Sequence, residues 1–320
     1  MRPTVVVIIP TWNRVGDLAR CLAALQLQSM LPNRVIIAGK VTDQSLLDWY
    51  QDSRPSFTEI PVDLVLSQAD ANVVAQQNRA LSETTEDIVA LTDDDAEPEH
   101  DWIERMLKHF EKKAVGGVGG RDWQPIERGN RSPVGVIRWY GRLVGNHHLG
   151  YGPARRVDVL KGVNCAYRGS ELRSIRFDER MRGSGTVINW ELAIGFAFIR
   201  KGYQLIYDPA VSVRHHIADR KDGDTNQRGI FEAESYFDNT YNEVLAIYDH
   251  LSPPRRLVYR IWSELIGTVG NPGIAQLLRT WIYSRYPRSS AWPRYHTAVK
   301  ARRSGIKAAN VSELTKSRNV

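Results

Sequence analysis

The first 91 residues alternate between short apolar runs and segments with helical periodicity. The run Thr4 to Ile9 is almost entirely β-branched, which is typical of a strand buried on both faces of a sheet. The predicted strands are 4–9, 34–38, 62–66 and 88–91, and the predicted helices are 15–28, 44–53 and 71–81. This alternation predicts an α/β fold, in which helices cover a mostly parallel sheet and ligands bind beyond the carboxyl ends of the strands.

Three consecutive carboxylates follow the last of these strands. Asp93, Asp94 and Asp95 come directly after the apolar segment Ile88 to Leu91. Like charges at this spacing repel one another, so water, hydrogen-bond donors or a hard divalent cation must satisfy them. An isolated acidic triplet is more often a solvated turn. Its position at the end of a buried strand favours a metal site here.

A histidine follows a later apolar segment in the same way. His215 comes after residues 210–213, so a strand could present its imidazole at the same edge of the sheet. A lone histidine is more often a surface group, and His216 beside it could serve instead. The residues alone therefore leave the choice between the two histidines open.

Four stretches of the chain carry an ordered set of motifs. They are Val-Ile-Ile-Pro-Thr-Trp-Asn-Arg at 7–14, Leu-Thr-Asp-Asp-Asp at 91–95, Lys-Gly-Val-Asn-Cys-Ala-Tyr-Arg at 161–168, and Asn-Trp-Glu-Leu at 189–192 followed by 202–215. Together they resemble the family 2 glycosyltransferases of GT-A fold, which move a sugar from a nucleotide diphosphate to an acceptor. The resemblance implies a Rossmann-like, mostly parallel central sheet flanked by helices.

The resemblance also implies a site for a nucleotide diphosphate sugar donor. The candidate donor-binding residues are Pro10, Thr11, Asn13, Arg14, Asn78, Asp93, Asp94, Lys161 and Asn164. Asp93 and Asp95 match the acids of the family's DXD motif, and with His215 they are the candidate ligands of Mn²⁺ or Mg²⁺. Such an ion, acting as a Lewis acid, neutralises the charge that develops on a departing diphosphate.

Glu191 is the candidate catalytic base. An acceptor hydroxyl needs a positioned group that takes its proton in the transition state. Glu191 matches the second member of an acidic pair in the family, while Trp190 replaces the first. The alternative is that Glu191 merely opens a helix, where the helix dipole stabilises an acid. As the base, Glu191 implies direct displacement with inversion of the anomeric centre.

Two departures from the family leave the nucleotide base open. Family members often carry acids where this chain has Ala38 and Gly39, although Asp43 follows shortly after. Gln77 stands where an arginine often precedes Asn78. Diphosphate binding is therefore expected to depend more on the metal and on Arg14.

The basic charge of the chain is concentrated at its carboxyl end. Residues 251–320 contain thirteen Lys and Arg against only Glu264 and Glu313, a net charge of +11 in a chain of +7. Basic amphipathic helices with aromatic residues suit an anionic membrane surface near a lipid-linked acceptor. A solvated tail packed on the catalytic domain is the alternative. No signature of nucleic-acid binding is present, so no nucleic-acid partner is expected.

These observations predict a catalytic domain and an appended extension. We expect a GT-A domain at 1–218, with a nucleotide-sugar half at about 1–120 and an acceptor half at about 121–218. Long connecting loops are expected at 121–156. The extension at 219–320 is predicted to be a mobile loop, including 219–225, followed by basic helices. Two cysteines without metal spacing and the lack of a long apolar run suggest a cytoplasmic protein, peripheral on the inner face of the cell membrane.

The expected function is inverting, metal-dependent transfer of a sugar to a glycan or lipid-linked acceptor, in polysaccharide or surface-glycan biosynthesis. Two alternatives stay open. Trp190, Ala38 and Gly39 would suit a noncatalytic sugar-binding or membrane-binding relative. A sugar-phosphate nucleotidyltransferase would share the sheet and the acidic metal site, but it favours a Gly-rich phosphate loop, which is not found near residue 10.

Overall fold

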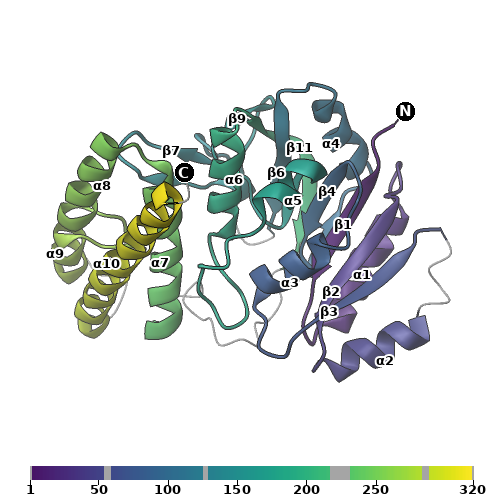
Figure 1. The fold of residues 1–320 in the computed structure, drawn as a ribbon, viewed down its shortest axis with the longest axis horizontal. Coiled ribbons are helices and arrows are strands. Elements are labelled where there is room, and N and C mark those ends of the chain that lie inside the picture. Colours follow the sequence, from purple (N-terminus) through teal and green to yellow (C-terminus); the bar gives the residue numbers. More distant parts are fainter. Residues whose placement is uncertain (1, 54–58, 125–128, 217–230, 283–287, 319–320) are drawn as a thin grey trace. The chain divides into compact units, whose positions relative to one another are not determined.

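The computed structural model describes residues 2–53, 59–124, 129–216, 231–282 and 288–318 (Figure 1). Contacts divide the chain into two compact units. Unit 1 comprises Met1–Val136, Val144–Phe177 and Ile194–Asp219. Unit 2 comprises Ile137–Leu143, Asp178–Ala193 and Arg220–Val320.

Unit 1 is built on one mixed sheet. Its described strands are β1 (Val5–Pro10), β2 (Arg34–Lys40), β3 (Val62–Ser67), β4 (Ile88–Thr92), β5 (Ala96–Pro98), β6 (Val115–Trp123), β9 (Arg155–Val157), β10 (Asn164–Arg168) and β11 (Gln204–His215). They follow the order β3-β2-β1-β4-β10-β6-β11-β5, and β9 also pairs with β11. The first four strands of this order are parallel, β10 is antiparallel to both neighbours, and β6 and β11 are parallel.

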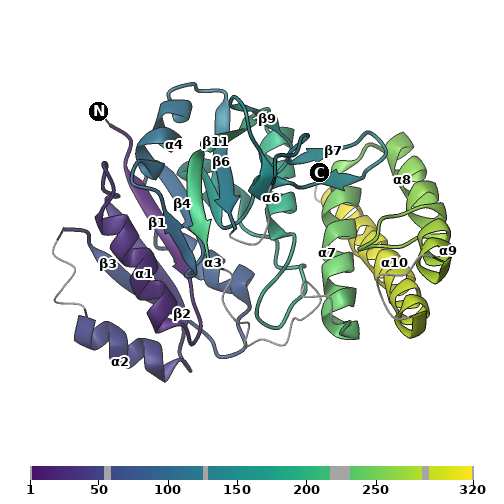
Figure 2. The same ribbon diagram turned by 180° about the vertical axis from the view of Figure 1, so that it is seen from behind.

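Helices cover both faces of this sheet (Figures 1 and 2). They are α1 (Val15–Gln26), α2 (Gln44–Ser53), α3 (Val73–Leu81), α4 (Trp102–Phe110), α5 (Gly169–Ile175) and α6 (Trp190–Arg200), the last of which begins in unit 2. Alternate residues of β1, such as Val7 and Ile9, pack in one core with Leu18 and Leu22 of α1 and Trp102 of α4. The predicted α/β fold with a mostly parallel central sheet is confirmed.

The segment 121–156 is more regular than predicted. β6 continues to Trp123, and a short pair of strands, β7 (Val136–Ile137) and β8 (Leu143–Val144), follows. A 3₁₀ turn at His147–Leu149 and strand β9 then complete the described part of this segment. Elements of two or three residues are too short to show a hydrophobic period, so the sequence could not reveal them.

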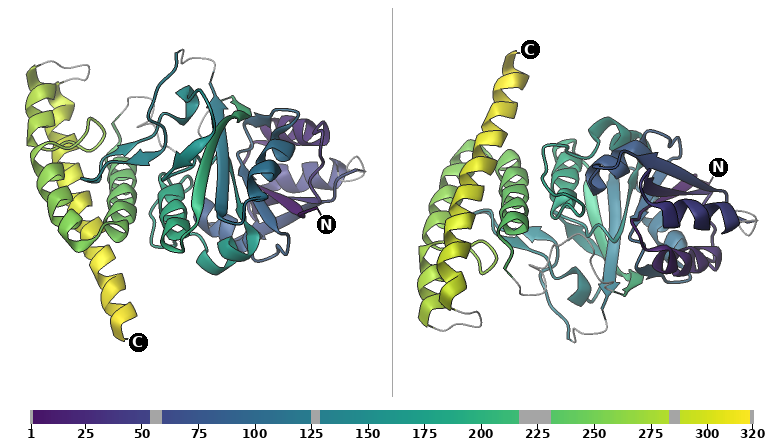
Figure 3. Two further views of the ribbon diagram at one scale, coloured as in Figure 1. Left: turned by 90° about the horizontal axis from the view of Figure 1, so that it is seen from above. Right: turned by 90° about the horizontal axis from the view of Figure 1, so that it is seen from below.

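Unit 2 is helical. Its helices are α7 (Ala233–His250), α8 (Pro253–Leu265), α9 (Ile274–Ile282) and the long α10 (Arg288–Arg318), which packs against α7 and α9 (Figure 3). The predicted helical, basic extension is confirmed, whereas the predicted loop 219–225 lies outside the described residues. In the part of the chain that the structure describes, no helix combines the length and apolar character needed to cross a membrane.

Residues 178–193, which the sequence assigned to the catalytic domain, group by their contacts with the carboxyl-terminal helices. Buried Asn242 of α7 explains part of this grouping. Its side chain accepts a hydrogen bond from Arg182 N at 2.8 Å and donates to the carbonyl oxygens of Arg182 and Ile188. Arg182 Nε also donates to Asp238 Oδ1 at 2.6 Å. Side-chain contacts over more than fifty residues of chain cannot be read from a local pattern.

A bulge in β11 places a strict requirement on β6. The parallel pairing of the two strands shifts register between Asp208 and Ser212. The bulge brings the carbonyl oxygen of Val211 so close to Gly120 that a Cβ there would lie 1.7 Å from it. Only glycine fits at this position.

We predict that Gly120→Ala lowers the free energy of unfolding by about 3 kcal/mol, because backbone rather than a flexible side chain must move. The matched control is Gly16→Ala in α1, where an added Cβ meets nothing within 4 Å. That change should raise stability by roughly 0.5 kcal/mol through helix propensity. Urea denaturation measures both. Equal effects of the two changes would contradict the tight strand contact.

Candidate active site

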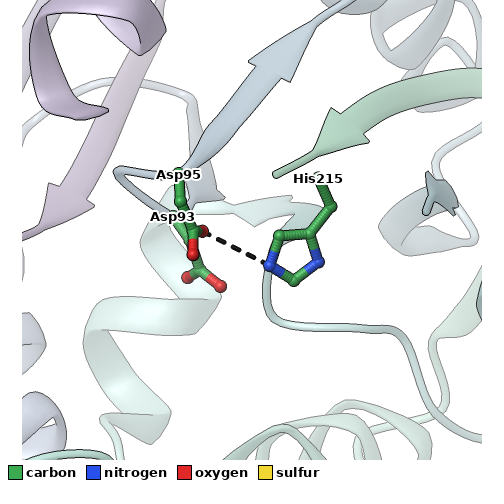
Figure 4. Close-up of side chains that lie close together, drawn as sticks. All are labelled: Asp93, Asp95 and His215. Atoms are coloured by element: carbon green, nitrogen blue, oxygen red, sulfur yellow. Dashed lines mark ion pairs between the residues drawn. The ribbon is translucent and has the colours of Figure 1, made fainter. Parts of the chain in front are cut away.

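Two carboxylates and one imidazole meet at the carboxyl edge of the sheet in unit 1. One potential ligand atom from each of Asp93, Asp95 and His215 lies within 4.8 Å of the others (Figure 4). His215 Nε2 is 3.3 Å from Asp95 Oδ1. The three residues predicted as metal ligands are therefore brought together in the fold.

The strand pairing fixes this convergence. Asp93 to Asp95 form the turn between β4 and β5, and β5 then pairs antiparallel with the end of β11, so that His215 lies opposite Ala96. The amide of His216 donates to the carbonyl oxygen of Asp95 at 2.8 Å. The backbone, rather than side-chain contacts alone, thus holds the imidazole beside the acids.

Asp122 is a site residue that the sequence interpretation missed. It lies near the end of β6, is only 1% exposed, and places Oδ2 at 3.8 Å from His215 Nδ1. Burial opposes a charge on His215, but Asp122 and Asp95 outweigh it and raise the pKa of His215 to about 10. A carboxylate behind a histidine orients the ring and fixes which nitrogen faces a metal. Asp122 lies inside β6 after the glycine-rich segment 116–120 and Arg121, without the apolar run that precedes Asp93, so the local sequence carries no comparable signal.

His216, the alternative ligand, points elsewhere. Its Nε2 lies 3.0 Å from Glu97 Oε1, and its side chain is 44% exposed. The geometry selects His215.

Asp94 differs from its two neighbours. Thr11 Oγ1 donates to its Oδ2 at 2.7 Å, and Arg14 Nη1 donates to its Oδ1 at 3.2 Å. Burial raises the pKa of Asp94 to about 7, against the lowering effects of Arg14 and Thr11. Arg14 also lies 3.6 Å from Asp95. Asp94 therefore ties the loop after β1 to the acidic turn after β4, while Arg14 offsets part of their charge.

The loop after β1 carries the other residues of this region that are predicted to bind the nucleotide sugar. Pro10 ends β1 opposite Ala38 of β2, and the Thr11 amide donates to the carbonyl oxygen of Ala38 at 3.0 Å. Asn13 adopts a left-handed conformation, with φ of 54°, and its amide donates to Asp43 Oδ2 at 2.5 Å. Asp43, which is fully buried, thus holds the loop in place.

Two residues predicted to bind the nucleotide sugar, Asn164 and Asn78, make hydrogen bonds inside the protein. Asn164 is fully buried, accepts a hydrogen bond from Trp102 Nε1, and donates to the carbonyl oxygens of Arg121 and Val211. Asn78 is 3% exposed and exchanges two hydrogen bonds with the backbone of Phe177. These hydrogen bonds hold distant segments together, and the donor-binding role of the two residues stays a prediction.

Lys161 and Glu191 complete the predicted set. Lys161 lies half-buried before β10. Burial favours a higher pKa for Asp122, but the interaction with His215 and the charge of Lys161 lower the pKa of Asp122 overall. Glu191 lies half-buried in the first turn of α6, within unit 2. Asn189, the residue before α6, has φ of 72°. Its Nδ2 donates a hydrogen bond to the carbonyl oxygen of Asn239 in α7.

The metal-ligand atoms that Asp93, Asp95 and His215 offer at the sheet edge fit a divalent cation. Carboxylate oxygens suit Mg²⁺ and Mn²⁺, and a neutral imidazole adds a ligand that Mn²⁺ accepts. His215 holds a proton strongly beside Asp95 and Asp122, and a cation at the same place would replace that proton. The residues of the cluster therefore suit a bound metal without rearrangement of the strands.

The amino-acid sequence matches a known protein family over half of its length. Residues 6–167 match the family described as glycosyl transferase family 2. The chain belongs to this family. The resemblance seen in its motifs is thereby confirmed.

Relatives of known sequence and structure agree with the family assignment. The chain is 28% identical over 218 residues to the pre-mycofactocin glycosyltransferase of Mycobacterium tuberculosis, covering 66% of this chain and 42% of that protein. It spans less than half of the length of the curated relatives it matches.

Two solved structures share the fold across almost the whole chain. One is the mannosyltransferase PcManGT from Pyrobaculum calidifontis in complex with GDP-Man and Mn²⁺, with a TM-score of 0.60, 18% identity, and coverage of 98% of this chain and 88% of that one. The other is S. aureus TarS 1-349 in complex with UDP-GlcNAc, with a TM-score of 0.56, 12% identity, and coverage of 98% and 92%. The predicted GT-A fold is confirmed.

We predict that Asp122→Asn weakens Mn²⁺ binding by about 10- to 100-fold, because His215 loses the carboxylate that orients it. Isothermal titration calorimetry measures the affinity, and near-ultraviolet circular dichroism checks the fold. The control is Glu97→Gln, which neutralises a carboxylate that pairs with His216 outside the cluster. Wild-type Mn²⁺ affinity in Asp122→Asn would exclude the positioning role.

Proposed function

We propose that this member of glycosyl transferase family 2 transfers a sugar from a nucleotide diphosphate sugar to a glycan or lipid-linked acceptor, with inversion and with a divalent cation. The observation that carries the proposal is the meeting of Asp93, Asp95 and His215 at the carboxyl edge of the sheet. A noncatalytic relative has no need for such a ligand set, and this favours an enzyme.

Asp93, Asp95 and His215 would hold Mn²⁺ or Mg²⁺. The bound ion would supply Lewis-acid stabilisation of the diphosphate leaving group. Arg14 borders the same place and is 21% exposed in its side chain. A guanidinium that pairs with carboxylates can also pair with phosphate oxygens, so Arg14 would contact the diphosphate of the donor. Asp122, at 3.8 Å from His215, would orient the imidazole, and Lys161 adds positive charge near Asp122.

The nucleotide base is left open by the chain's own residues. Ala38 ends the β1–β2 pairing without a side-chain acceptor, and both oxygens of Asp43 already accept hydrogen bonds, from Asn13 N on one side and from Ser45 and Leu46 on the other. The related structures hold GDP-Man in one case and UDP-GlcNAc in another. Donor identity must therefore be measured.

Glu191 is proposed as the base that accepts the proton of the acceptor hydroxyl. Its segment is anchored to α7 by Asn189 and Asn242, which limits how far the carboxylate can move. The role requires that Glu191 reach the acceptor hydroxyl when the donor is bound. A direct displacement by that oxygen would invert the anomeric centre.

The assignment to polysaccharide or surface-glycan assembly rests on resemblance alone, and the cytoplasmic location stays a prediction from composition. A sugar-phosphate nucleotidyltransferase is the second candidate because it would share the acidic cluster. Its substrates differ, and this difference separates the two functions in a binding assay.

We expect Glu191→Gln to bind donor as the wild type does but to release nucleoside diphosphate at least about 100-fold more slowly, since the amide cannot accept the proton. The control is Glu104→Gln, which changes another first-turn helix acid. If Glu191 acts only on the helix dipole, both changes would cost about 0.3–1 kcal/mol of stability and leave turnover intact. Full turnover in Glu191→Gln would refute the base assignment.

Thermal denaturation with a panel of nucleotide sugars identifies the donor. A cognate donor with Mn²⁺ at about 100 times its dissociation constant should stabilise the fold by about 2.7 kcal/mol. Asp95→Ala should abolish this Mn²⁺-dependent shift, whereas Asp101→Ala, which removes an acid paired with Arg105, should retain it. Stabilisation by a nucleoside triphosphate and a sugar phosphate, in place of any nucleotide sugar, would support the nucleotidyltransferase.

A further inference from the structure

Helix α8 is apolar on its outer side as well as its inner side. Its inner side buries Tyr259 and Ser263, which lie one helical turn apart. The opposite side carries Leu257, Ile261 and Leu265 at successive turns, and these side chains are 60%, 52% and 53% exposed. Large aliphatic residues in such a stripe are unusual on a surface that meets only water.

Helix α9 lies beside α8 in unit 2 (Figures 1 and 3). It also has an exposed apolar side. None of its residues is buried. Ile274, Leu278, Trp281 and Ile282 recur at spacings of three and four and are between 46% and 64% exposed. We call the two exposed stripes together the α8–α9 face.

Positive charge accompanies this face. Residues 251–282 contain four arginines and one acid, Glu264. Arg260 and Arg279 are exposed, and neither pairs with an acid in the described parts of the chain. Apolar side chains with tryptophan, flanked by unpaired arginines, are the pattern of helices that lie in the interface of an anionic bilayer.

A pocket of about 590 Å³ opens between α8, α9 and residues 139–142 of the same unit. Aromatic rings form one side of it: the ring centroids of Tyr140 and Trp262 lie 5.1 Å apart with the planes tilted by 57°, and Trp139 lies edge-on to Tyr140. Arg142 and Arg279 also line it, and both are exposed. Two guanidinium groups beside an aromatic wall suit a phosphate that is attached to an apolar or ring-containing group.

We propose that the α8–α9 face binds an anionic membrane surface, with a lipid headgroup phosphate held in the pocket by Arg142 and Arg279. The apolar stripes would enter the boundary between headgroups and acyl chains, and the arginines would pair with headgroup phosphates. A second copy of this chain fits the face less well, because its own arginines would meet like charges across the contact. The face is independent of the acidic cluster, so the proposal extends the proposed function without resting on it.

Flotation of the full chain with vesicles tests the proposal. The protein should float with vesicles of phosphatidylcholine and phosphatidylglycerol but much less with phosphatidylcholine alone, and high salt should weaken binding. Ile261→Ser combined with Trp281→Ser should lower the partition coefficient by about tenfold or more, through lost apolar burial. Arg142→Gln combined with Arg279→Gln should remove most of the preference for the anionic lipid.

The matched control is Leu27→Ser, which removes a 71% exposed leucine from unit 1 and should leave flotation unchanged. Mn²⁺-dependent donor binding should be the same in all of these variants, so a failure here is distinct from a failure of the transferase assignment. The proposal is wrong if the wild type does not bind anionic vesicles, or if both double variants float with them to the same extent as Leu27→Ser. It is also wrong if light scattering shows a dimer that Ile261→Ser with Trp281→Ser dissociates, since a second copy would then cover the face.

Discussion

The structure of the site depends on how closely placed carboxylates are kept from repelling one another. Asp94, Asp95 and Asp122 are all less than 10% exposed, and Asp93 lies beside them. Charges in so little water interact strongly. In the protein itself, Arg14 offsets them, the neighbouring acids raise the pKa of His215 to about 10, and burial raises the pKa of Asp94 to about 7. A bound divalent cation could take over these compensations, because each of them supplies positive charge or a proton to the acids.

The need to offset this negative charge explains why residues from four strands meet at one site. The acids and the imidazole come from the ends of β4, β6 and β11, and the loop after β1 supplies Thr11 and Arg14. The strand ladder sets their positions before any ligand arrives, so little reorganisation is needed when charge develops on a leaving group. The bulge of β11 against Gly120 is part of the same geometry, because it lies in β11 shortly before His215 and so affects where the histidine is placed.

Local patterns in the sequence predicted the parts of this arrangement that depend on local chemistry. Buried runs of β-branched residues identified β1 and β2, and acids after such a run identified Asp93 and Asp95. Asp122 was missed because its importance depends on β6 lying beside β11, a neighbour relation between distant segments. The structural contacts of Asn78 and Asn164 could not be predicted for a similar reason: their partners, which are backbone groups and the Trp102 side chain, lie up to 99 residues away. The sequence likewise predicted basic helices in the extension at 219–320 but could not tell that an apolar side of α8 would remain exposed.

The interior of unit 2 connects the proposed base to the proposed membrane face. The segment before Glu191 is tied to α7 through Asn242, and α7 packs against α10 so closely that a Cβ on Gly305 would lie 2.9 Å from the carbonyl oxygen of Tyr241. Arg302 of α10 in turn donates to Asn271 and to the carbonyl oxygen of Pro272, in the turn that joins α8 to α9. Close-packed helices of this kind are hard to compress, so a displacement of one helix is passed on to its neighbours. A surface that fixed α8 and α9 would therefore also restrict the movement of Glu191.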